Sequence, residues 1–144
     1  MKKTFRSIAA GLNSTWQPEA DPSSLTRWYL SVCDIPIAGL QVEDLCRAVR
    51  QELFLSELLP FVVDVLDKDL LSGFIDDGEL LAAVTRLSSS YWSNDVLLAQ
   101  KMRSILVKNG DSLVNEPDAV KSASILESKL ISVMGRKGDR FIFC

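Results

Sequence analysis

The sequence predicts an all-α protein, a compact single-domain bundle of about six or seven helices. Apolar residues recur at i, i+3, i+4 and i+7 in several segments, which is the period of one buried helix face. Residues typical of helix ends, mainly Ser, Asp, Asn, Gly and Pro, separate these segments. A chain of 144 residues, 47% of them hydrophobic, can bury roughly two-thirds of its unfolded surface without metals or disulfides. We therefore expect one helical domain over residues 23–144, preceded by a loosely structured N-terminal arm over residues 1–22.

The arm is predicted because Pro18 and Pro22 interrupt it and no apolar period persists, although Trp16 can anchor it. The first helix is expected to begin at Ser23 or Ser24, because either residue is a suitable N-cap. Asp34-Ile35-Pro36 would end this helix, and its buried face would carry Leu25, Trp28, Tyr29 and Val32.

Two helices are expected in the middle of the chain. In the first, Glu43 and Asp44 occupy the first turn, where the helix dipole favours anions, and the apolar stripe is Val42, Leu45, Cys46 and Val49. Residues 53–66 are apolar almost all the way round, which predicts a central helix buried by its neighbours. Pro60 should kink this helix or split it. A strand remains the alternative because Val62, Val63 and Val65 are β-branched.

Three further helices are predicted in the C-terminal half. After a loop over residues 68–77 that turns at Gly73, Asp76 or Asp77 would cap a helix with the stripe Leu80, Leu81, Val84 and Leu87. Ser93 or Asn94 would cap the next helix, which carries Leu98, Met102, Ile105 and Leu106 and stops at Lys108-Asn109-Gly110. The last helix should start near Pro117, end at Gly135 and bury Ala119, Ala123, Leu126, Leu130, Val133 and Met134.

Charge is strongly segregated along the chain. Residues 34–79 hold 11 of the 19 acidic residues and three basic ones, a net charge of −8, whereas the whole chain carries −3. A surface of one sign attracts a partner of the opposite sign and speeds their encounter. We interpret this segment as a binding surface for a basic protein, with a merely solvated surface as the alternative.

Several kinds of chemistry are disfavoured. The chain has no histidine, and so it lacks the usual general base and the commonest metal ligand. Asp67-x-Asp69 resembles the start of a calcium loop, but the required glycine is Ser72 and the twelfth position is Gly78. Cys33, Cys46 and Cys144 lack the paired spacing of a zinc or redox site, and we expect idle thiols in a reducing compartment. We predict no enzyme activity, no cofactor and no metal.

Direct nucleic-acid binding is disfavoured by the acidic composition, and no segment approaches the length of a membrane span. Among the aromatic residues, Trp28 is expected to be internal because it lies on an apolar stripe. Tyr91 and Trp92 border a serine-rich break and fit either a core or an interface. The predicted protein is cytoplasmic and works by binding another protein.

Residues 40–84 carry a recognisable order of motifs: Leu40-Gln41-Val42-Glu43-Asp44-Leu45-Cys46-Arg47, then Gln51, Leu55, Leu58-Leu59-Pro60, Leu66 and Gly78-Glu79-Leu80-Leu81. This order resembles the contact-dependent growth inhibition immunity proteins, in which a helix pair is followed by a "GDLL" helix. Gln41 stands where the family tends to have threonine, which removes a capping box with Asp44, and Glu79 replaces the usual aspartate.

The resemblance implies a small, helical, cytoplasmic protein that binds the C-terminal toxin domain of a cognate exoprotein delivered by a neighbouring cell. Such a toxin is commonly a nuclease, whose cationic active site an acidic surface can occupy in a heterodimer. The expected toxin-binding residues are Asp64, Asp67, Asp69, Asp76, Asp77 and Glu79, with Glu43 and Tyr91 as weaker candidates. The alternative function is a helical adaptor that binds cellular proteins or itself through exposed apolar helix faces and has no toxin partner.

Overall fold

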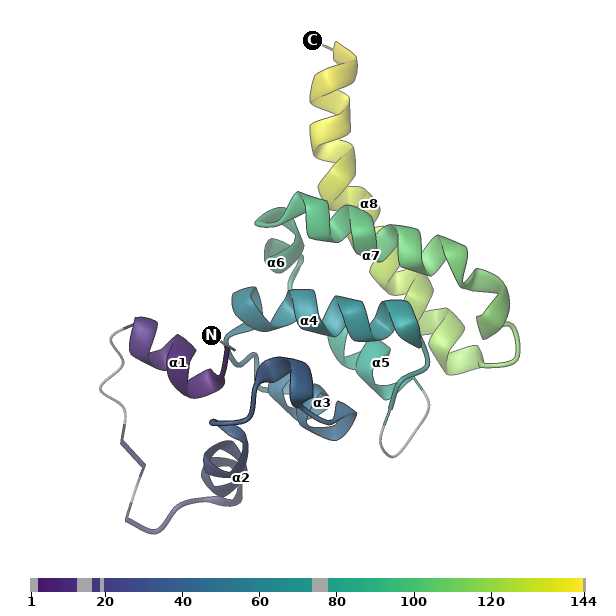
Figure 1. Ribbon diagram of the computed structural model, residues 1–144. Coiled ribbons are helices and arrows are strands. Elements are labelled where there is room, and N and C mark those ends of the chain that lie inside the picture. The colour runs from purple at the N-terminus through teal and green to yellow at the C-terminus, as the bar shows by residue number, and fades with distance from the viewer. Residues whose placement is uncertain (1–2, 13–16, 19, 74–77, 144) are drawn as a thin grey trace.

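The computed structural model describes residues 3–12, 17–18, 20–73 and 78–143, with side chains up to residue 134. All regular structure in these residues is helical, which confirms the all-α class (Figure 1). Among the described elements, the α-helices for which the sequence predicted no helix are short ones, α1 and α6. The elements are α1 (Phe5–Gly11), α2 (Ser24–Val32), η1 (Ile37–Gly39), α3 (Val42–Arg50), α4 (Leu55–Lys68), α5 (Glu79–Thr85), α6 (Ser89–Ser93), α7 (Val96–Lys108), η2 (Gly110–Leu113) and α8 (Pro117–Phe143).

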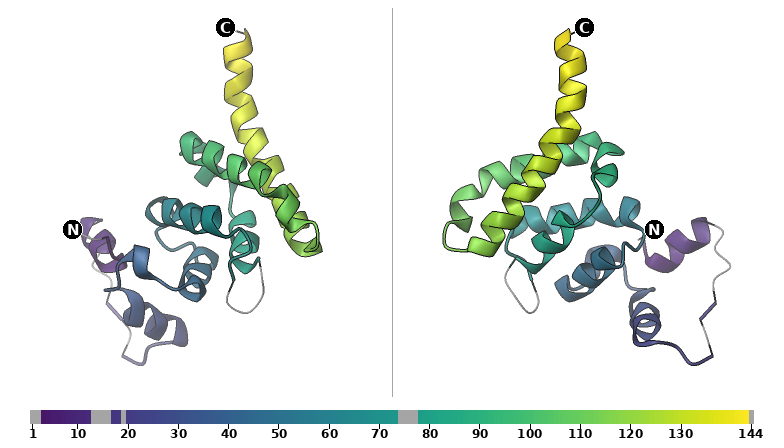
Figure 2. Two further views of the ribbon diagram at one scale, coloured as in Figure 1. Left: turned by 45° about the vertical axis from the view of Figure 1, so that its right-hand side comes forward. Right: turned by 180° about the vertical axis from the view of Figure 1, so that it is seen from behind.

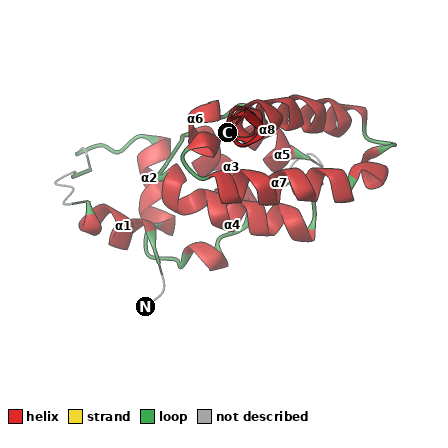
Figure 3. Ribbon diagram, turned by 90° about the horizontal axis from the view of Figure 1, so that it is seen from above, coloured by secondary structure: helices red, strands yellow, loops and turns green. Residues whose placement is uncertain are grey.

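Helix α4 lies in the middle of the structure. It contacts α7 on one side and α3 and η1 on another, and α5 packs between α3 and α8. Helices α1 and α2 lie at the N-terminal end of the body, and the last turns of α8 extend beyond the other helices (Figures 1 and 2). Seen from above, α4 and α7 lie next to each other, in agreement with the contacts between them (Figure 3).

The prediction of a central buried helix is confirmed, with both ends two residues later than expected. Six side chains of α4 are buried: Leu55, Leu58, Leu59, Val62, Val63 and Leu66. The strand alternative and the split at Pro60 are both wrong, since the helix runs through Pro60 without interruption. Pro60 removes one backbone hydrogen bond to the Ser56 carbonyl, and burial of the surrounding apolar side chains outweighs that loss.

Residues 5–11, expected to belong to a loosely structured arm, form helix α1 instead. Thr4 and Ser7 form a reciprocal capping box at its start. Phe5 is fully buried, and its ring centroid lies 6.1 Å from the centroids of both Tyr29 and Phe54. Tertiary packing of this one aromatic ring therefore fixes a helix that is too short to be stable alone. Trp16 lies outside the described residues.

The helix ends show one confirmed cap and three corrections. Ser23 caps α2 as predicted, through a hydrogen bond from the Thr26 amide. Helix α5 follows Gly78, whose φ of +82° suits glycine, and so the N-cap is not Asp76 or Asp77, which lie outside the described residues. Helix α7 is capped by Asp95, because Ser93 ends helix α6 and Asn94 is its C-cap. Helix α8 continues through Gly135, where a glycine costs about 1 kcal/mol without ending a helix.

Lys129 joins α8 to the C-terminal end of α5. Its Nζ donates hydrogen bonds to the carbonyl oxygens of Thr85 and Leu87, at 2.6 and 3.2 Å. The Thr85 hydroxyl in turn donates to the carbonyl oxygens of Leu81 and Ser122. A cation at the end of a helix satisfies its last carbonyls and the negative end of its dipole. Lys129 therefore stabilises the packing of α8 on α5.

Candidate functional site

Three of the predicted acids, Asp64, Asp67 and Asp69, lie close together in sequence at the C-terminal end of α4. We call these three residues the acidic end of α4. All three are exposed. Asp64 forms an ion pair with Lys101 of α7. The pKa of Lys101 is raised above its ordinary value, first by the hydrogen bond to Asp64 and then by the charges of Asp64 and Asp67.

Asp69 accepts a hydrogen bond within the fold, whereas Asp67 has only an electrostatic attraction to Lys101. Asp69 is the C-cap of α4, and its Oδ1 accepts a hydrogen bond from the Leu71 amide at 3.0 Å, which shapes the turn that follows. Asp67 makes no hydrogen bond or ion pair with any described residue. It lies in the last turn of α4, where the negative end of the helix dipole disfavours an anion. Asp67 is thus the predicted acid that folding explains least.

Glu79 lies apart from this group, at the start of α5. Its Oε2 is 3.1 Å from Nη1 of Arg50 on α3, and only 17% of its side chain is exposed. Glu79 lines a polar groove of about 790 Å³ between α3, α5 and the start of α8. Within the described part of the chain, three cations and three anions line this groove, and so its described lining is not acidic: Arg50, Arg86, Lys121, Glu79, Glu116 and Asp118. Asp76 and Asp77 lie outside the described residues.

The two weaker candidates lie elsewhere. Glu43 is exposed in the first turn of α3 and has no hydrogen-bond or ion-pair partner among the described residues. Tyr91, on α6, is half-buried, and its hydroxyl donates to Glu52 Oε1 at 3.0 Å. That hydrogen bond is the main reason why the pKa of Tyr91 is raised. Tyr91 is therefore bonded to the α3–α4 connection rather than to the acidic end of α4.

The other aromatic residues divide between core and surface. Trp92 is fully buried, and its indole Nε1 has no hydrogen-bond partner in the described part of the chain. Trp28 is only half-buried, although the sequence placed it inside. Its Nε1 donates to Asp44 Oδ1 at 2.9 Å, and the Arg47 guanidinium carbon lies 5.6 Å from the centre of its ring. Two residues of α3 thus hold Trp28 in place at the surface of α2.

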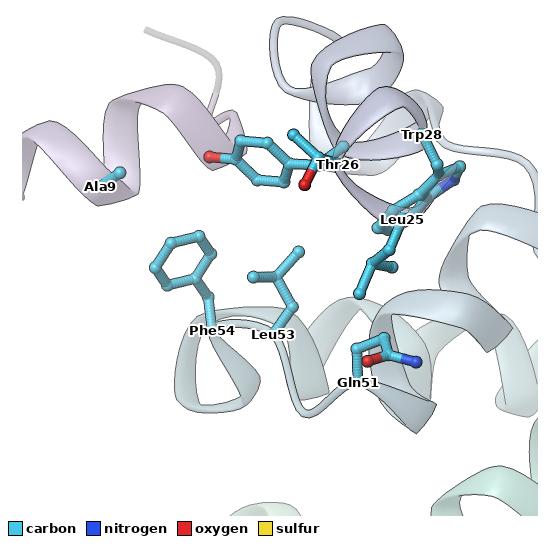
Figure 4. A pocket seen from close by; sticks show the side chains of 8 residues that line it. Ala9, Leu25, Thr26, Trp28, Gln51, Leu53 and Phe54 are labelled. Carbon is cyan, nitrogen blue, oxygen red and sulfur yellow. The ribbon is translucent and has the colours of Figure 1, made fainter. Parts of the chain in front are cut away.

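An apolar pocket of about 330 Å³, not predicted from the sequence, lies between α1, α2 and the α3–α4 connection (Figure 4). In Figure 4, Leu25 points from α2 toward the same space that Leu53 and Phe54 enter from the connection. We call this space the apolar pocket; it is lined by Ala9, Leu25, Thr26, Trp28, Tyr29, Gln51, Leu53 and Phe54. Three segments distant in sequence form it, and no local pattern of residues predicts such a meeting.

The described residues offer little for catalysis. Cys46 is completely buried, and this burial is the main reason why its pKa is raised to about 11, so that the thiol stays protonated. Cys33 is also buried. No three Cys, Asp or Glu side chains of the described residues are placed to hold a metal ion, and none of the helices in that part of the chain is long and apolar enough to cross a membrane. What the surface does offer is exposed acids and an apolar pocket.

Comparison with models of protein families gives a match over more than half of the chain. A family model described as CDI immunity proteins, where CDI is contact-dependent growth inhibition, matches residues 12–102. The matched range is 91 of the 144 residues and covers α2 to α6, the first half of α7 and the acidic end of α4. No curated protein matches the chain.

Proposed function

Since the chain belongs to the family of CDI immunity proteins, we propose that it binds a basic nuclease toxin domain of a cognate exoprotein and covers the toxin's active site. The protein would work in the cytoplasm of the producing cell, as one half of a heterodimer with the toxin. The acidic end of α4 is the surface that we assign to this contact.

The observation that carries this assignment is the position of Asp67. The residue is exposed, unpaired within the described chain and set at the end of the helix where a carboxylate is least favourable. A charge that costs stability and makes no intramolecular bond is readily explained by a partner outside the chain. A basic nuclease surface offers that partner, because it is built to hold phosphates.

Inhibition would be steric and electrostatic, without chemistry. Asp64 and Asp67 would attract the cationic cleft and orient the encounter, and the adjoining helices would exclude the nucleic-acid substrate. Lys101 holds Asp64 in place before the toxin arrives, so that less side-chain freedom is lost on binding. We assign the polar groove no part in binding, because the charges of the described residues that line it balance.

The test is co-purification of this protein with the toxin domain encoded beside it, together with a growth assay in cells that express that toxin. The informative variant is Asp64→Asn with Asp67→Asn. Its control is Asp21→Asn with Asp111→Asn, which changes the net charge equally at two exposed positions outside α4. We expect the first variant to weaken the complex and its salt dependence, and the control to behave as the wild type.

The outcomes separate the parts of the proposal. Without complex formation or rescue of growth by the wild-type protein, neutralisation of that toxin is refuted. Rescue that both variants share equally with the wild type would keep neutralisation and reject the acidic end of α4 as the site. A complex that forms while the toxin still cleaves nucleic acid would reject active-site coverage.

A further inference from the structure

We propose that the apolar pocket receives one aromatic or aliphatic side chain of the toxin domain, flanked on the toxin by basic residues. This inference rests on the proposed function, and it adds a second, apolar contact to the acidic one. The pocket is open, and it is lined mainly by carbon atoms of α1, α2 and the α3–α4 connection (Figure 4).

The wall of the pocket is built from strained backbone. Helix α3 ends in a Schellman motif: the Glu52 amide donates to the Val49 carbonyl at 2.9 Å and the Leu53 amide donates to the Ala48 carbonyl at 3.0 Å. This motif usually takes glycine at the left-handed position, but here Glu52 occupies it with a φ of +52°. Phe54 follows at a φ of +47°, before the first turn of α4. Each of these two non-glycine residues therefore holds an unfavourable left-handed backbone conformation.

Strain of this kind persists where the surroundings over-determine it, and such residues concentrate at binding sites. The Tyr91 hydroxyl holds the Glu52 carboxylate, and the buried Phe5 ring packs against Phe54. As a result Leu53 and Phe54 point toward the pocket in Figure 4. The opposite wall is also fixed, because Asp44 and Arg47 hold Trp28. A pocket that is formed before binding loses little side-chain entropy when it is filled.

The size and lining of the pocket favour a side chain over a free ligand. A volume of about 330 Å³ lies at the lower limit of small-molecule sites, which span roughly 300–1,000 Å³. Among the described residues, no charged side chain lines it that would orient a polar ligand. Interfaces concentrate their binding energy in aromatic or aliphatic anchors that enter such pockets.

The charges beside the pocket indicate the chemistry of the partner. Helix α3, which holds Trp28, and the α3–α4 connection carry three acidic residues beside the pocket: Glu43, Asp44 and Glu52. Arg47 is the basic residue on this side, because Arg50 is ion-paired with Glu79. Glu43 and Arg47 are one helical turn apart, and so the unpaired Glu43 lies on the α3 face that carries the Trp28 contact. On the other two walls, Arg6 of α1 and Arg27 of α2 are ion-paired with Asp34 and Asp21. The excess charge beside the pocket is therefore the negative charge on the α3 side, which suits a basic protein with an apolar anchor.

Two leucines of α2 provide a matched test. Leu25 and Leu30 are 41% and 40% exposed, but only Leu25 lines the pocket. Leu25→Ala is expected to weaken the affinity for the toxin domain about tenfold without changing the salt dependence of binding, and Leu30→Ala should leave the affinity within twofold of the wild type. Equal affinities of the two variants would overturn the proposal.

Filling the pocket is the complementary experiment, and it does not remove any packing. Ala9 lines the pocket, whereas its neighbour Ala10 is exposed outside it. Ala9→Phe should hold or raise the melting temperature by filling the space and should weaken toxin binding at least tenfold; Ala10→Phe should not weaken it. Wild-type affinity in an Ala9→Phe protein of undiminished stability would overturn the proposal.

These results are distinguishable from a failure of the proposed function. If the wild-type protein does not bind the toxin domain, the proposed function fails, whatever the variants do. If it binds, and the Asp64→Asn/Asp67→Asn variant loses affinity while Leu25→Ala does not, the acidic contact holds and the pocket is rejected. If isolated Leu25→Ala and wild-type proteins differ in oligomeric state, the occupant is a second copy of this chain, which also rejects a toxin side chain.

Discussion

Asp67→Asn should keep or raise the melting temperature of the protein and weaken its binding of the toxin domain. Removing an anion from the last turn of α4 relieves its repulsion with the helix dipole, which contributes about 0.3–1 kcal/mol. The loss of the attraction to Lys101 offsets only part of this gain, because Lys101 is ion-paired with Asp64 and its attraction to Asp67 lies at the low end of the roughly 0–1 kcal/mol of exposed charge pairs. Chains of this size shift by roughly 2–4 °C per kcal/mol, and so the melting temperature should stay constant or rise by up to about 4 °C.

The same substitution should weaken binding of the toxin domain. A unit charge pair at 4 Å contributes about 1 kcal/mol in water, and the loss of one such pair lowers the affinity roughly fivefold. The decrease should appear mainly in the association rate and should diminish as salt screens the charges. Thermal melting and surface plasmon resonance at low and physiological salt measure both effects.

Asp21→Asn is the control, since Asp21 is 98% exposed and precedes α2, outside the proposed site. It should leave the association rate within the change expected from net charge alone. A melting temperature of Asp67→Asn several degrees below the wild type would refute our reading of the helix-end position. An association rate equal to that of Asp21→Asn at low salt would refute the assignment of Asp67 to the toxin contact.

Three further predictions test the fold. Lys129→Met removes two charged hydrogen bonds to the end of α5 and should lower the free energy of unfolding by about 2 kcal/mol, or the melting temperature by roughly 4–8 °C. Lys121→Met, on the same helix, should change the melting temperature little. Equal shifts for the two variants would contradict the capping role of Lys129. The Arg6 guanidinium donates a hydrogen bond to Asp34 and lowers the pKa of this carboxyl below the ordinary 3.8. The pair therefore stabilises the fold above about pH 4, and this stabilisation is lost as the pH falls through the folded-state pKa of Asp34. In urea unfolding, the stabilities of the wild type and Asp34→Asn should differ at about pH 6 and converge near about pH 2. Cys46, with a pKa of about 11, should resist iodoacetamide at pH 8 in the native protein and react in urea, and mass spectrometry that finds it alkylated without denaturant would show that the thiol is accessible.

The helices that the sequence predicted well are those with a wide apolar stripe of their own. The stripe Leu80, Leu81, Val84 and Leu87 is buried in full, and α4 is buried around most of its circumference. These patterns are local, because side chains three or four residues apart share a helix face whatever the rest of the chain does. A run that is apolar almost throughout has no such stripe, and so only the structure excluded the strand alternative in residues 53–66.

The errors have two other causes, which are dependence on distant contacts and helix-end signals that do not end or start a helix here. Helix α1 is too short to predict from period, and it exists because Phe5 packs against Tyr29 and Phe54. The cap of α7 moved to Asp95 because the serine-rich break is itself the short helix α6. Gly135 does not end α8, since glycine within a helix is a cost rather than a stop signal.

The same limit applies to the candidate site. Charge segregation in the sequence indicated an acidic surface, but it could not show which carboxylates are already engaged. Glu79 is paired with Arg50, 29 residues away, and Asp64 with Lys101, 37 residues away. Those partners lie on other helices, and so only the three-dimensional arrangement separates Asp67 from its neighbours. The apolar pocket depends on three segments and stays invisible in any single one.

Helix α8 has a consequence for how the protein is made. It packs on α5, α6 and α7, and it is synthesised after them. At about 5–20 residues per second, its 27 residues take roughly 1–5 s to synthesise, whereas a helical bundle folds in microseconds to milliseconds. The faces of α5, α6 and α7 that α8 covers are therefore exposed for seconds in every nascent chain. A chaperone at the ribosome can bind these faces during those seconds. The rate at which folded protein appears is then set by the rate of translation rather than by the rate of folding.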